Sequence, residues 1–422
     1  MNIRKRSRGF IGVVAMTSVA ALALTLTGCS RDGGGSTPGN DAKASPGITD
    51  TSLTFGITSP LTGATAGPGN CTVDGALAYF GEKNDEGGIK FGDGKTRKIN
   101  IKSYDDGYDP QKALANFQQM VSDGVFAAGL GLGTPTNRAW REAAISEKVP
   151  QVLVQTGDPI FSDTKQSPEQ IGLVPTYSQE GEAFGELLAS SKDKHTVAVL
   201  YQNDDYGKGY VEGLEDALKG SSNVTIVKKL SYEATDTSVD AQLTELAATK
   251  ADVFFNAMSI TPLVISALQK AQQLKWLPSW FLPSNTSSPV AILQPGGGSA
   301  FPGIYSVAFS ESSSSPVFQA SDAGKNFLAA IAKYTKQSGV PAFPHCVWSW
   351  IGAATLEQAF MKMEQPTRAS FMKALRSIKG FEAPFMLPGS TIDTTVDGKP
   401  AVAKVQVQKY NGKGYATAES WG

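Results

Sequence analysis

Short apolar runs alternate with segments of helical spacing along the first part of the chain. The runs typical of buried strands occupy residues 53–58, 99–104, 125–130 and 151–154. The segments between them, in which apolar residues recur every three or four positions, occupy 73–85, 109–122 and 137–147. Asp109 before Pro110 is a typical helix start, because Asp caps free backbone amides and Pro suits the first turn. This alternation predicts an α/β fold with a parallel sheet and helices on both faces.

The same alternation recurs in the middle of the chain. Strands are predicted at 196–201, 224–230, 253–256 and 280–282, and helices at 180–190, 209–219, 239–249 and 262–273. After Tyr305 the pattern predicts another strand, helices at 321–338, 348–363 and 368–377, and a β-rich tail that includes 402–409. Because about 370 residues are too many for one compact core, two similar α/β halves are expected.

The N-terminal segment has the layout of an export signal. Four cationic residues lie within residues 1–8, and an apolar run rich in small side chains follows from Phe10 to Leu26. The sequence Leu-Thr-Gly-Cys at 26–29 resembles a lipobox, so residues 1–28 are predicted to be a lipoprotein signal peptide and Cys29 the lipidated N-terminus. The alternative is an uncleaved membrane anchor, but the run is at the short edge of the roughly 17 to 25 residues that span a bilayer.

The segment that follows the signal lacks the apolar residues needed to fold. Gly, Ser, Pro and Asn crowd it, so residues 29–48 are predicted to form a flexible tether. Removing four cationic residues with the signal changes the formal net charge from −1 to about −5, which disfavours nucleic acid as a partner. With 41% apolar and 18% charged residues and no second spanning run, the remaining chain is expected to be globular and extracytoplasmic.

A glycine-rich segment after the strand at 125–130 is the first candidate for binding chemistry. It reads GLGLGTPT from Gly129 to Thr136 and opens the next helix. Open parallel sheets bind ligands beyond the carboxyl ends of their strands, and helix amides with the Thr134 and Thr136 hydroxyls suit an anion such as a carboxylate. A dinucleotide fingerprint is disfavoured because the third glycine is misplaced and no acidic residue follows at a convincing strand end. A purely structural turn stays open as the alternative.

Five short motifs along the chain resemble one protein family. They are ITSPLTG at 57–63, NDEGGI at 84–89, YDD at 104–106 with Asp109 and Pro110, VSDGV at 121–125, and DYG at 205–207. In this order they resemble the periplasmic solute-binding proteins of the leucine/isoleucine/valine type, which serve ABC importers. The resemblance runs from about residue 54 to 415. It implies a type I periplasmic binding fold, with two Rossmann-like lobes joined by three crossings. Lobe one is expected at 50–175 and 308–385, and lobe two at 176–307 and 386–422.

The resemblance also suggests ligand contacts at the ends of the predicted strands. In the family, a carboxylate is held where Gly133, Thr134 and Thr136 lie here. A main-chain and a hydroxyl contact come from the place of Thr156 and Gly157. Tyr206, which follows a strand end in the other lobe, can cover a ligand with its ring or pack at the helix start.

Two positions depart from the amino-acid binders of the family. Met258 and Ser259 replace an aromatic residue, and Ser284 with Asn285 replaces a Glu that pairs with the ligand's α-amino group. Because a buried ammonium needs a partner of opposite charge, the ligand is expected to lack an α-amino group. The missing charge could also come from Asp204, Asp205 or Glu233.

The two cysteines of the body, Cys71 and Cys346, form an even pair in an oxidising compartment, which allows a disulfide. Two free buried thiols are the alternative, and the family's usual bridge, near Tyr108 and Leu132, is absent. Neither His195 nor His345 has neighbours in the sequence that resemble a catalytic triad or a metal site.

The acidic run at 105–109 lacks the spacing of a calcium loop, so a solvated loop and helix cap is expected there. No cofactor, no metal and no enzymatic activity are predicted.

These observations predict a monomeric, lipid-anchored receptor at the outer face of the cell membrane. It is expected to capture an amino acid or an organic or aromatic acid between its lobes and present it to an ABC permease and ATPase complex. A sensor that signals through a membrane partner without transport is the alternative. An extracytoplasmic enzyme is a third possibility, which requires catalytic residues that the sequence does not reveal.

Overall fold

The computed structural model describes residues 43–421. The predicted signal peptide, Cys29 and most of the predicted tether lie outside the described residues. Within residues 43–421, no helix is long and apolar enough to cross a membrane.

The first sheet has six strands, in the order β2-β3-β1-β4-β5-β6. All adjacent strands are parallel except β2 and β3. The strands are β1 (Ser52–Ser59), β2 (Ile89–Lys90), β3 (Thr96–Asp105), β4 (Ala127–Gly129), β5 (Gln151–Val154) and β6 (Gln170–Gly172). Ala127 and Ala128 of β4 point to opposite faces, as neighbours in a strand must, and each joins a different hydrophobic core.

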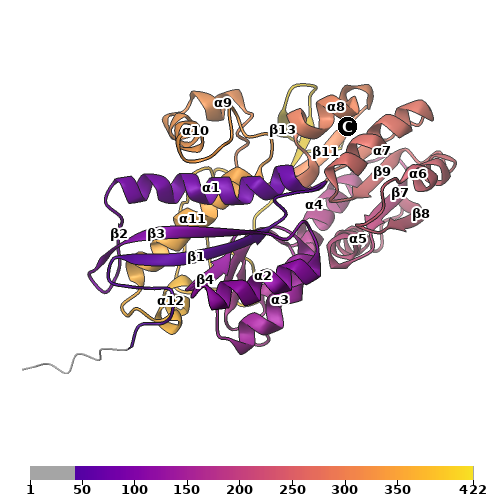
Figure 1. Cartoon of the computed structure of the whole chain (residues 1–422). Coiled ribbons are helices and arrows are strands. Elements are labelled where there is room, and N and C mark those ends of the chain that lie inside the picture. Colours follow the sequence, from indigo (N-terminus) through magenta and orange to yellow (C-terminus); the bar gives the residue numbers. More distant parts are fainter. Residues whose placement is uncertain (1–42, 422) are drawn as a thin grey trace, which may run out of the picture. The chain divides into compact units, whose positions relative to one another are not determined.

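Helices cover both faces of this sheet, as Figure 1 shows with α1 above and α2 and α3 below β1 and β3. The larger core contains residues of α1 (Ala66–Asp85), α9 (Pro316–Ala320), α10 (Asp322–Tyr334), α11 (His345–Lys362) and α12 (Arg368–Leu375). The smaller core contains residues of α2 (Pro110–Ser122) and α3 (Thr134–Ser146). The six-stranded sheet with these helices is called the first lobe below.

The second sheet has seven strands, in the order β13-β12-β11-β10-β9-β7-β8. The five strands from β8 to β11 are parallel, and β12 and β13 extend the sheet antiparallel. The strands are β7 (His195–Gln202), β8 (Val224–Tyr232), β9 (Val253–Ala257), β10 (Ser279–Phe281), β11 (Ile304–Ala308), β12 (Gln406–Tyr410) and β13 (Tyr415–Thr417).

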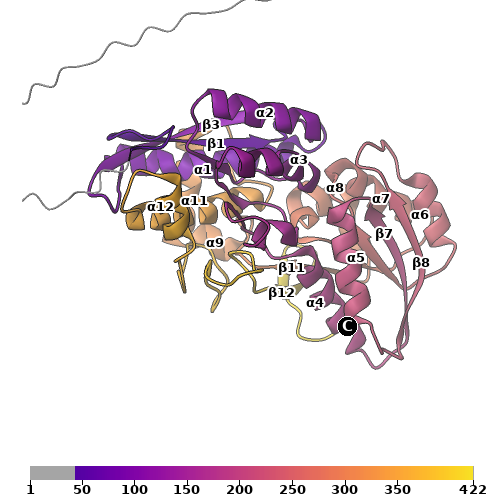
Figure 2. The ribbon, with the colours of Figure 1, turned by 90° about the horizontal axis from the view of Figure 1, so that it is seen from below.

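Phe254 and Phe255 of β9 belong to different cores, so this sheet is also covered on both faces. One face packs against α4 (Tyr177–Ala189) and α5 (Asp205–Ala217), which lie side by side in Figure 2. The other packs against α6 (Asp240–Ala247), α7 (Thr261–Gln273) and the short α8 (Gln294–Gly296). This assembly is called the second lobe below. The chain passes between the lobes before α4, after β11 and before β12.

The α/β fold with two mostly parallel sheets is confirmed, but several helices begin earlier than the sequence pattern predicts. Helix α1 begins at Ala66 rather than Val73. The sequence pattern missed its first turns because Gly67, Pro68 and Gly69 have a low preference for helix. Gly69 is required there, since an added Cβ would lie 1.8 Å from the Pro60 carbonyl oxygen. Tertiary packing therefore overrides a weak local preference for helix.

The predicted tether extends too far into the folded body. The Ser45 amide donates to the Pro366 carbonyl oxygen over 2.9 Å, and the Thr54 amide donates to the Gly47 carbonyl oxygen over 2.8 Å. Ile48 is buried in the larger core of the first lobe. One apolar side chain and these backbone bonds are enough to hold residues 45–48 on the body, although their composition is typical of a linker.

A disulfide between Cys71 and Cys346 joins α1 to α11, with the two Cα atoms 4.3 Å apart. The helices approach closely because Gly75 faces α11, where an added Cβ would lie 2.2 Å from the Cys346 carbonyl oxygen. Both cysteines are buried.

The acidic run at 105–109 includes the predicted helix cap, but one of its residues is buried and not solvated as expected. Asp109 caps α2 by accepting from the Gln111 amide over 2.8 Å. Asp106 is fully buried and accepts from the Thr58 hydroxyl and the Tyr108 amide, each over 2.9 Å. Burial raises the pKa of Asp106 to about 6. No cluster of three or more potential metal ligands occurs within the described part of the chain.

Candidate binding site

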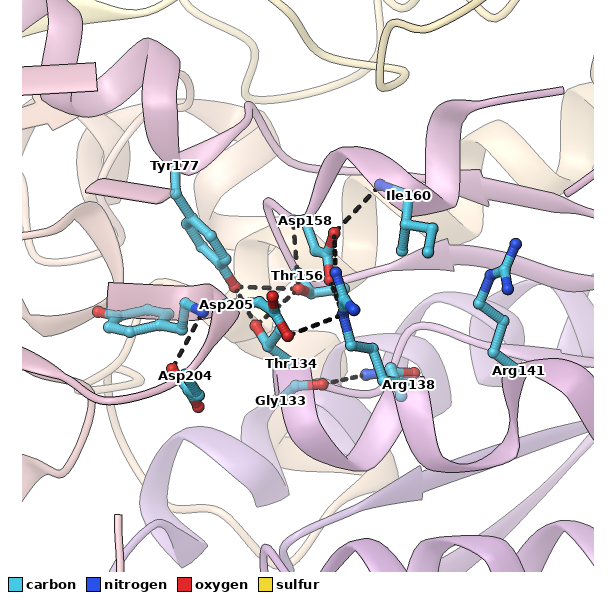
Figure 3. Close-up of polar contacts among 12 residues, drawn as sticks. Gly133, Thr134, Arg138, Arg141, Thr156, Asp158, Ile160, Tyr177, Asp204 and Asp205 are labelled. Atoms are coloured by element: carbon cyan, nitrogen blue, oxygen red, sulfur yellow. Dashed lines mark hydrogen bonds and ion pairs between the residues drawn. The ribbon is translucent and has the colours of Figure 1, made fainter. Parts of the chain in front are cut away.

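Three buried hydroxyl groups meet where the first lobe joins the second. The Thr134 hydroxyl lies 2.9 Å from that of Thr156 and 2.8 Å from that of Tyr177, and the last two are 3.0 Å apart. Figure 3 shows this hydroxyl triad. Thr134 opens α3 after Gly133, whose φ of 108° strongly favours glycine. Each hydroxyl has one proton, so the three hydrogen bonds of the triad use all three protons. A carboxylate that enters the site can accept a hydrogen bond from the triad only by replacing one of these bonds.

A strained backbone directs the chain into this site. Leu153 has a φ of 53°, which is unusual for a residue other than glycine. It lies where the pairing of β5 with β6 is irregular, and such irregularities often redirect side chains beside functional sites. Gln155 and Thr156 follow directly.

A small cavity of about 40 Å³ lies between the two lobes. Six of the predicted site residues line it, namely Gly133, Thr134, Tyr206, Ser259, Ser284 and Asn285. The other three do not. The Thr136 hydroxyl bonds to backbone carbonyl oxygens within its own loop, and Thr156 contributes to the triad. Gly157 lies against the crossing to α4, where an added Cβ would be 2.5 Å from the Pro175 carbonyl oxygen.

The second lobe supplies an aromatic and amide wall. The Tyr206 hydroxyl lies 3.0 Å from Asn285 Oδ1, and its ring packs edge-on against Tyr177 with the ring centres 4.8 Å apart. The Ser259 hydroxyl is 3.4 Å from that of Tyr108, a residue of the first lobe. Side chains from both lobes therefore form the cavity.

A carboxyl group that the sequence analysis missed also lines the cavity. Glu180 of α4 is only 2% exposed, and it accepts from the Ser284 amide (3.0 Å), the Ser284 hydroxyl (2.7 Å) and the Tyr210 hydroxyl (2.9 Å). Burial raises the pKa of Glu180 to about 7. Glu180 thus places a carboxyl group against Ser284, and it is not one of the three residues that the sequence analysis considered as sources of the missing charge. Glu180 follows a helix cap, where an acidic residue has an ordinary structural role.

Two further polar side chains in the cavity wall have no hydrogen-bond partner in the protein. Gln155 is 6% exposed, and both Oε1 and Nε2 are unpaired. His345 is 3% exposed, with Nδ1 unpaired, and burial lowers the pKa of its imidazole to about 3. Buried polar groups in proteins are nearly always bonded, so these two side chains have free capacity for hydrogen bonds to a ligand. Whether the polar atoms of Gln155 and His345 have partners depends on residues far away in the chain, so no signal in the sequence identifies these two side chains.

An ion pair links the lobes beside the cavity. Arg138 of α3 contacts the buried carboxylate of Asp158, with Nη2 3.1 Å from Oδ1. Its Nε lies 3.2 Å from Asp205 Oδ2, at the start of α5 in the second lobe. Figure 3 shows Arg138 between these two carboxylates.

His195 lies elsewhere, at the first residue of β7, and it has neighbours that the sequence did not reveal. Its Nδ1 is 2.5 Å from Asp252 Oδ2 and its Nε2 is 2.9 Å from the Ser191 hydroxyl. This order resembles a catalytic triad, but Ser191 follows the carbonyl end of α4. The partial negative charge there opposes an oxyanion, so we assign His195 a structural role.

Comparison with known proteins gives consistent results. Residues 52–415 match the family described as periplasmic binding protein. Leu/Ile/Val-binding protein homolog 3 of Brucella melitensis is 26% identical over 215 residues, which is 48% of this chain and 53% of that protein. The chain thus spans about half the length of the curated relatives it matches.

Two solved structures resemble the fold over most of the chain. One is a fatty acid ABC transporter substrate-binding protein from Thermomonospora curvata, with a TM-score of 0.76, 22% identity and coverage of 90% of this chain and 94% of that one. The other is a branched chain amino acid ABC transporter from Thermus thermophilus with bound valine. Its TM-score is 0.76, with 15% identity and coverage of 88% and 97%.

Proposed function

Because this chain belongs to the periplasmic binding protein family, we propose that it captures a small carboxylated molecule between its two lobes and delivers it to an ABC importer. The observation that carries the proposal is the cavity between the lobes. Its wall holds Gln155 and His345 with unpaired polar atoms, and Glu180 beside them. A binding protein needs such groups, because each gains a partner when the ligand enters.

The choice of a carboxylated ligand rests on the hydroxyl triad and on the similar structures. Valine and fatty acids, which the names of those structures contain, both carry a carboxyl group. Thr134 begins α3, and the positive end of the helix dipole favours an anion at this position. Amino acids and acids without an amino group both remain candidates, since Glu180 supplies a carboxyl group that can face an ammonium.

We also propose that Cys29 is lipidated after removal of residues 1–28 and holds the protein at the outer face of the cell membrane. The tether then covers at most residues 29–44, because Ser45 and Ile48 pack on the body. The working partners are a membrane permease with its ATPase, and the protein acts as a monomer. Labelling with a radioactive fatty acid tests the anchor, and Cys29→Ala is expected to abolish the label.

A thermal-shift screen of the protein without its signal peptide tests the binding function. The panel contains amino acids, short and long straight-chain acids, and aromatic acids. A ligand at one hundred times its Kd stabilises the folded state by about 2.7 kcal/mol. For a body of this size, that corresponds to a rise in Tm of about 3 °C. If no compound of the panel raises Tm, the proposal fails.

Matched variants locate the site. Gln155→Met removes an unpaired buried amide, so it is expected to leave the Tm of the ligand-free protein unchanged or raised and to reduce the ligand-induced shift. Gln170→Met is the control, because Gln170 is also buried and, although its Oε1 is unpaired, its Nε2 donates to Gln151 Oε1 over 2.8 Å. It is expected to lower Tm and leave the ligand-induced shift intact.

A further inference from the structure

A second, larger cavity lies beside the binding cavity. It has a volume of about 580 Å³ and lies between residues 307–318 and 341–344 on one side and residues 287–289 and the β12–β13 hairpin on the other. We call it the side groove. Its volume falls within the roughly 300 to 1,000 Å³ typical of small-molecule sites. Ser284 and Trp348 line both the side groove and the binding cavity, so the two spaces are neighbours.

The serine hydroxyls of the side groove are largely bonded within the protein. Ser287 donates to the Ser284 carbonyl oxygen over 3.0 Å, and Ser313 donates to that of Pro341 over 3.1 Å. Ser310 accepts from Trp348 Nε1 over 3.1 Å. The groove therefore requires few polar partners from a ligand. The remaining wall combines large apolar side chains with polar ones. The apolar side chains are Val307, Phe309, Phe318, Phe343 and Leu387, and the polar ones include Glu311, Gln406, Gln408, Asn411 and Lys413.

The binding cavity differs from the side groove in its size and in its unpaired polar atoms. At about 40 Å³ it accommodates only a small group, and its wall holds the unpaired atoms of Gln155 and His345. A polar group of a ligand is favoured in this cavity, and an apolar body is favoured in the side groove, where it displaces water from apolar surface.

We propose that the ligand is an elongated amphipathic acid whose carboxyl group occupies the binding cavity and whose apolar body passes between Ser284 and Trp348 into the side groove. This inference rests on the proposed binding function. Ser284 belongs to the second lobe and Trp348 to α11 of the first. The passage between them therefore lies at the boundary of the lobes, and it widens when the lobes separate.

Calorimetric titration with straight-chain monocarboxylic acids from propionate to myristate, below their micelle concentrations, tests the inference. Affinity is expected to rise about fourfold for each methylene that the side groove buries. Val317→Asp places a charge in the groove wall. It is expected to preserve the fold, because Val317 is 78% exposed and lies in the first turn of α9, where an acidic residue is favourable.

The Val317→Asp variant is expected to weaken long acids at least tenfold and leave propionate unchanged. Val396→Asp is the control, because Val396 is 48% exposed and lies outside the groove. An affinity that does not depend on chain length overturns the inference while the proposed function stands. The same holds if Val317→Asp weakens short and long acids equally. Failure of every acid and amino acid to bind overturns the proposed function as well.

Discussion

Replacing Glu180 by Gln is expected to change how the stability of the protein depends on pH. The pKa of Glu180 is raised by burial from its usual 4.5 to about 7. Between these values the folded protein holds a proton that the unfolded chain releases, so this group disfavours folding increasingly as pH rises. From pH 5 to pH 8 the loss for the natural protein amounts to about 2.5 kcal/mol.

The glutamine side chain of this variant cannot ionise and escapes that loss, but it introduces a different cost. The natural carboxylate accepts from the Ser284 amide and hydroxyl and from the Tyr210 hydroxyl. The amide NH2 group donates where the carboxylate accepts, as the O–H of the protonated Glu180 does at pH 5, and the Ser284 hydroxyl can turn to accept from it, so this cost is at most about 1 kcal/mol. Glu180→Gln is therefore expected to be about as stable as the natural protein at pH 5 and more stable than it at pH 8.

Urea unfolding of both proteins at pH 5, 6, 7 and 8, without ligand, measures this difference. Glu182→Gln is the control, because Glu182 is on the same helix and exposed, so little change in stability is expected at any pH. A stability difference between the natural protein and Glu180→Gln that stays constant from pH 5 to pH 8 would refute the reasoning.

The same group distinguishes two classes of ligand. An ammonium beside Glu180 favours its ionised form, so the affinity for an amino acid is expected to rise with pH through 7. A carboxylate beside it favours the protonated form, so the affinity for an acid without an amino group is expected to fall. Titrations at pH 6 and pH 8 separate the two classes, and Glu180→Gln is expected to remove either trend.

Three further predictions concern other contacts. Replacing Cys71 and Cys346 together by Ala removes a bond that closes a loop of 275 residues, so the free energy of unfolding is expected to fall by about 5 kcal/mol. Urea unfolding with and without a reductant measures this loss. The reductant is expected to destabilise the natural protein and to have no effect on the variant. Asp205→Asn removes the partly exposed carboxylate that Arg138 contacts in the second lobe. Ligand affinity is expected to fall by up to about fivefold at low salt but not at 1 M salt, and Tm is expected to stay nearly unchanged. Equal affinities of the two proteins at low salt would contradict a role of this ion pair in holding the lobes together. The pKa of buried His345 is lowered to about 3, so below pH 6.5 the unfolded chain takes up a proton that the folded protein does not, and the natural protein loses stability as pH falls. In His345→Gln this loss of stability is expected to be smaller by about 1.4 kcal/mol for each pH unit below 6. Unfolding of both proteins by acid measures the difference, and identical profiles would contradict the prediction.

Much of the fold was predictable because local signals agree with the tertiary structure. Asp109 and Pro110 placed the start of α2 correctly, and the apolar run at 151–154 matches β5. The errors lie where distant contacts decide the conformation. Gly69 is helical because α1 must approach the Pro60 backbone, and Ile48 is ordered because the core accepts its side chain.

The candidate site was predictable to a smaller extent. The predicted strand ends pointed to Thr134 and Tyr206, and both residues line the cavity. Glu180, Gln155 and His345 were missed, because what distinguishes them is burial and the presence or absence of a partner. These properties arise between lobes, from residues far apart in the chain, and no spacing in the sequence reports them.

The order of strands in the second sheet has a consequence for how the chain folds during synthesis. Strand β11 ends at Ala308, but its neighbour β12 begins at Gln406, after the whole segment that forms α9 to α12. Until the ribosome has made β12, one edge of β11 has no partner, and an open edge strand favours pairing with other chains. Trp421 then stacks on Tyr305 of β11, with the ring centres 4.5 Å apart. The second lobe is therefore completed only once β12 and Trp421 have been made, so a chain released before them exposes an edge prone to aggregation.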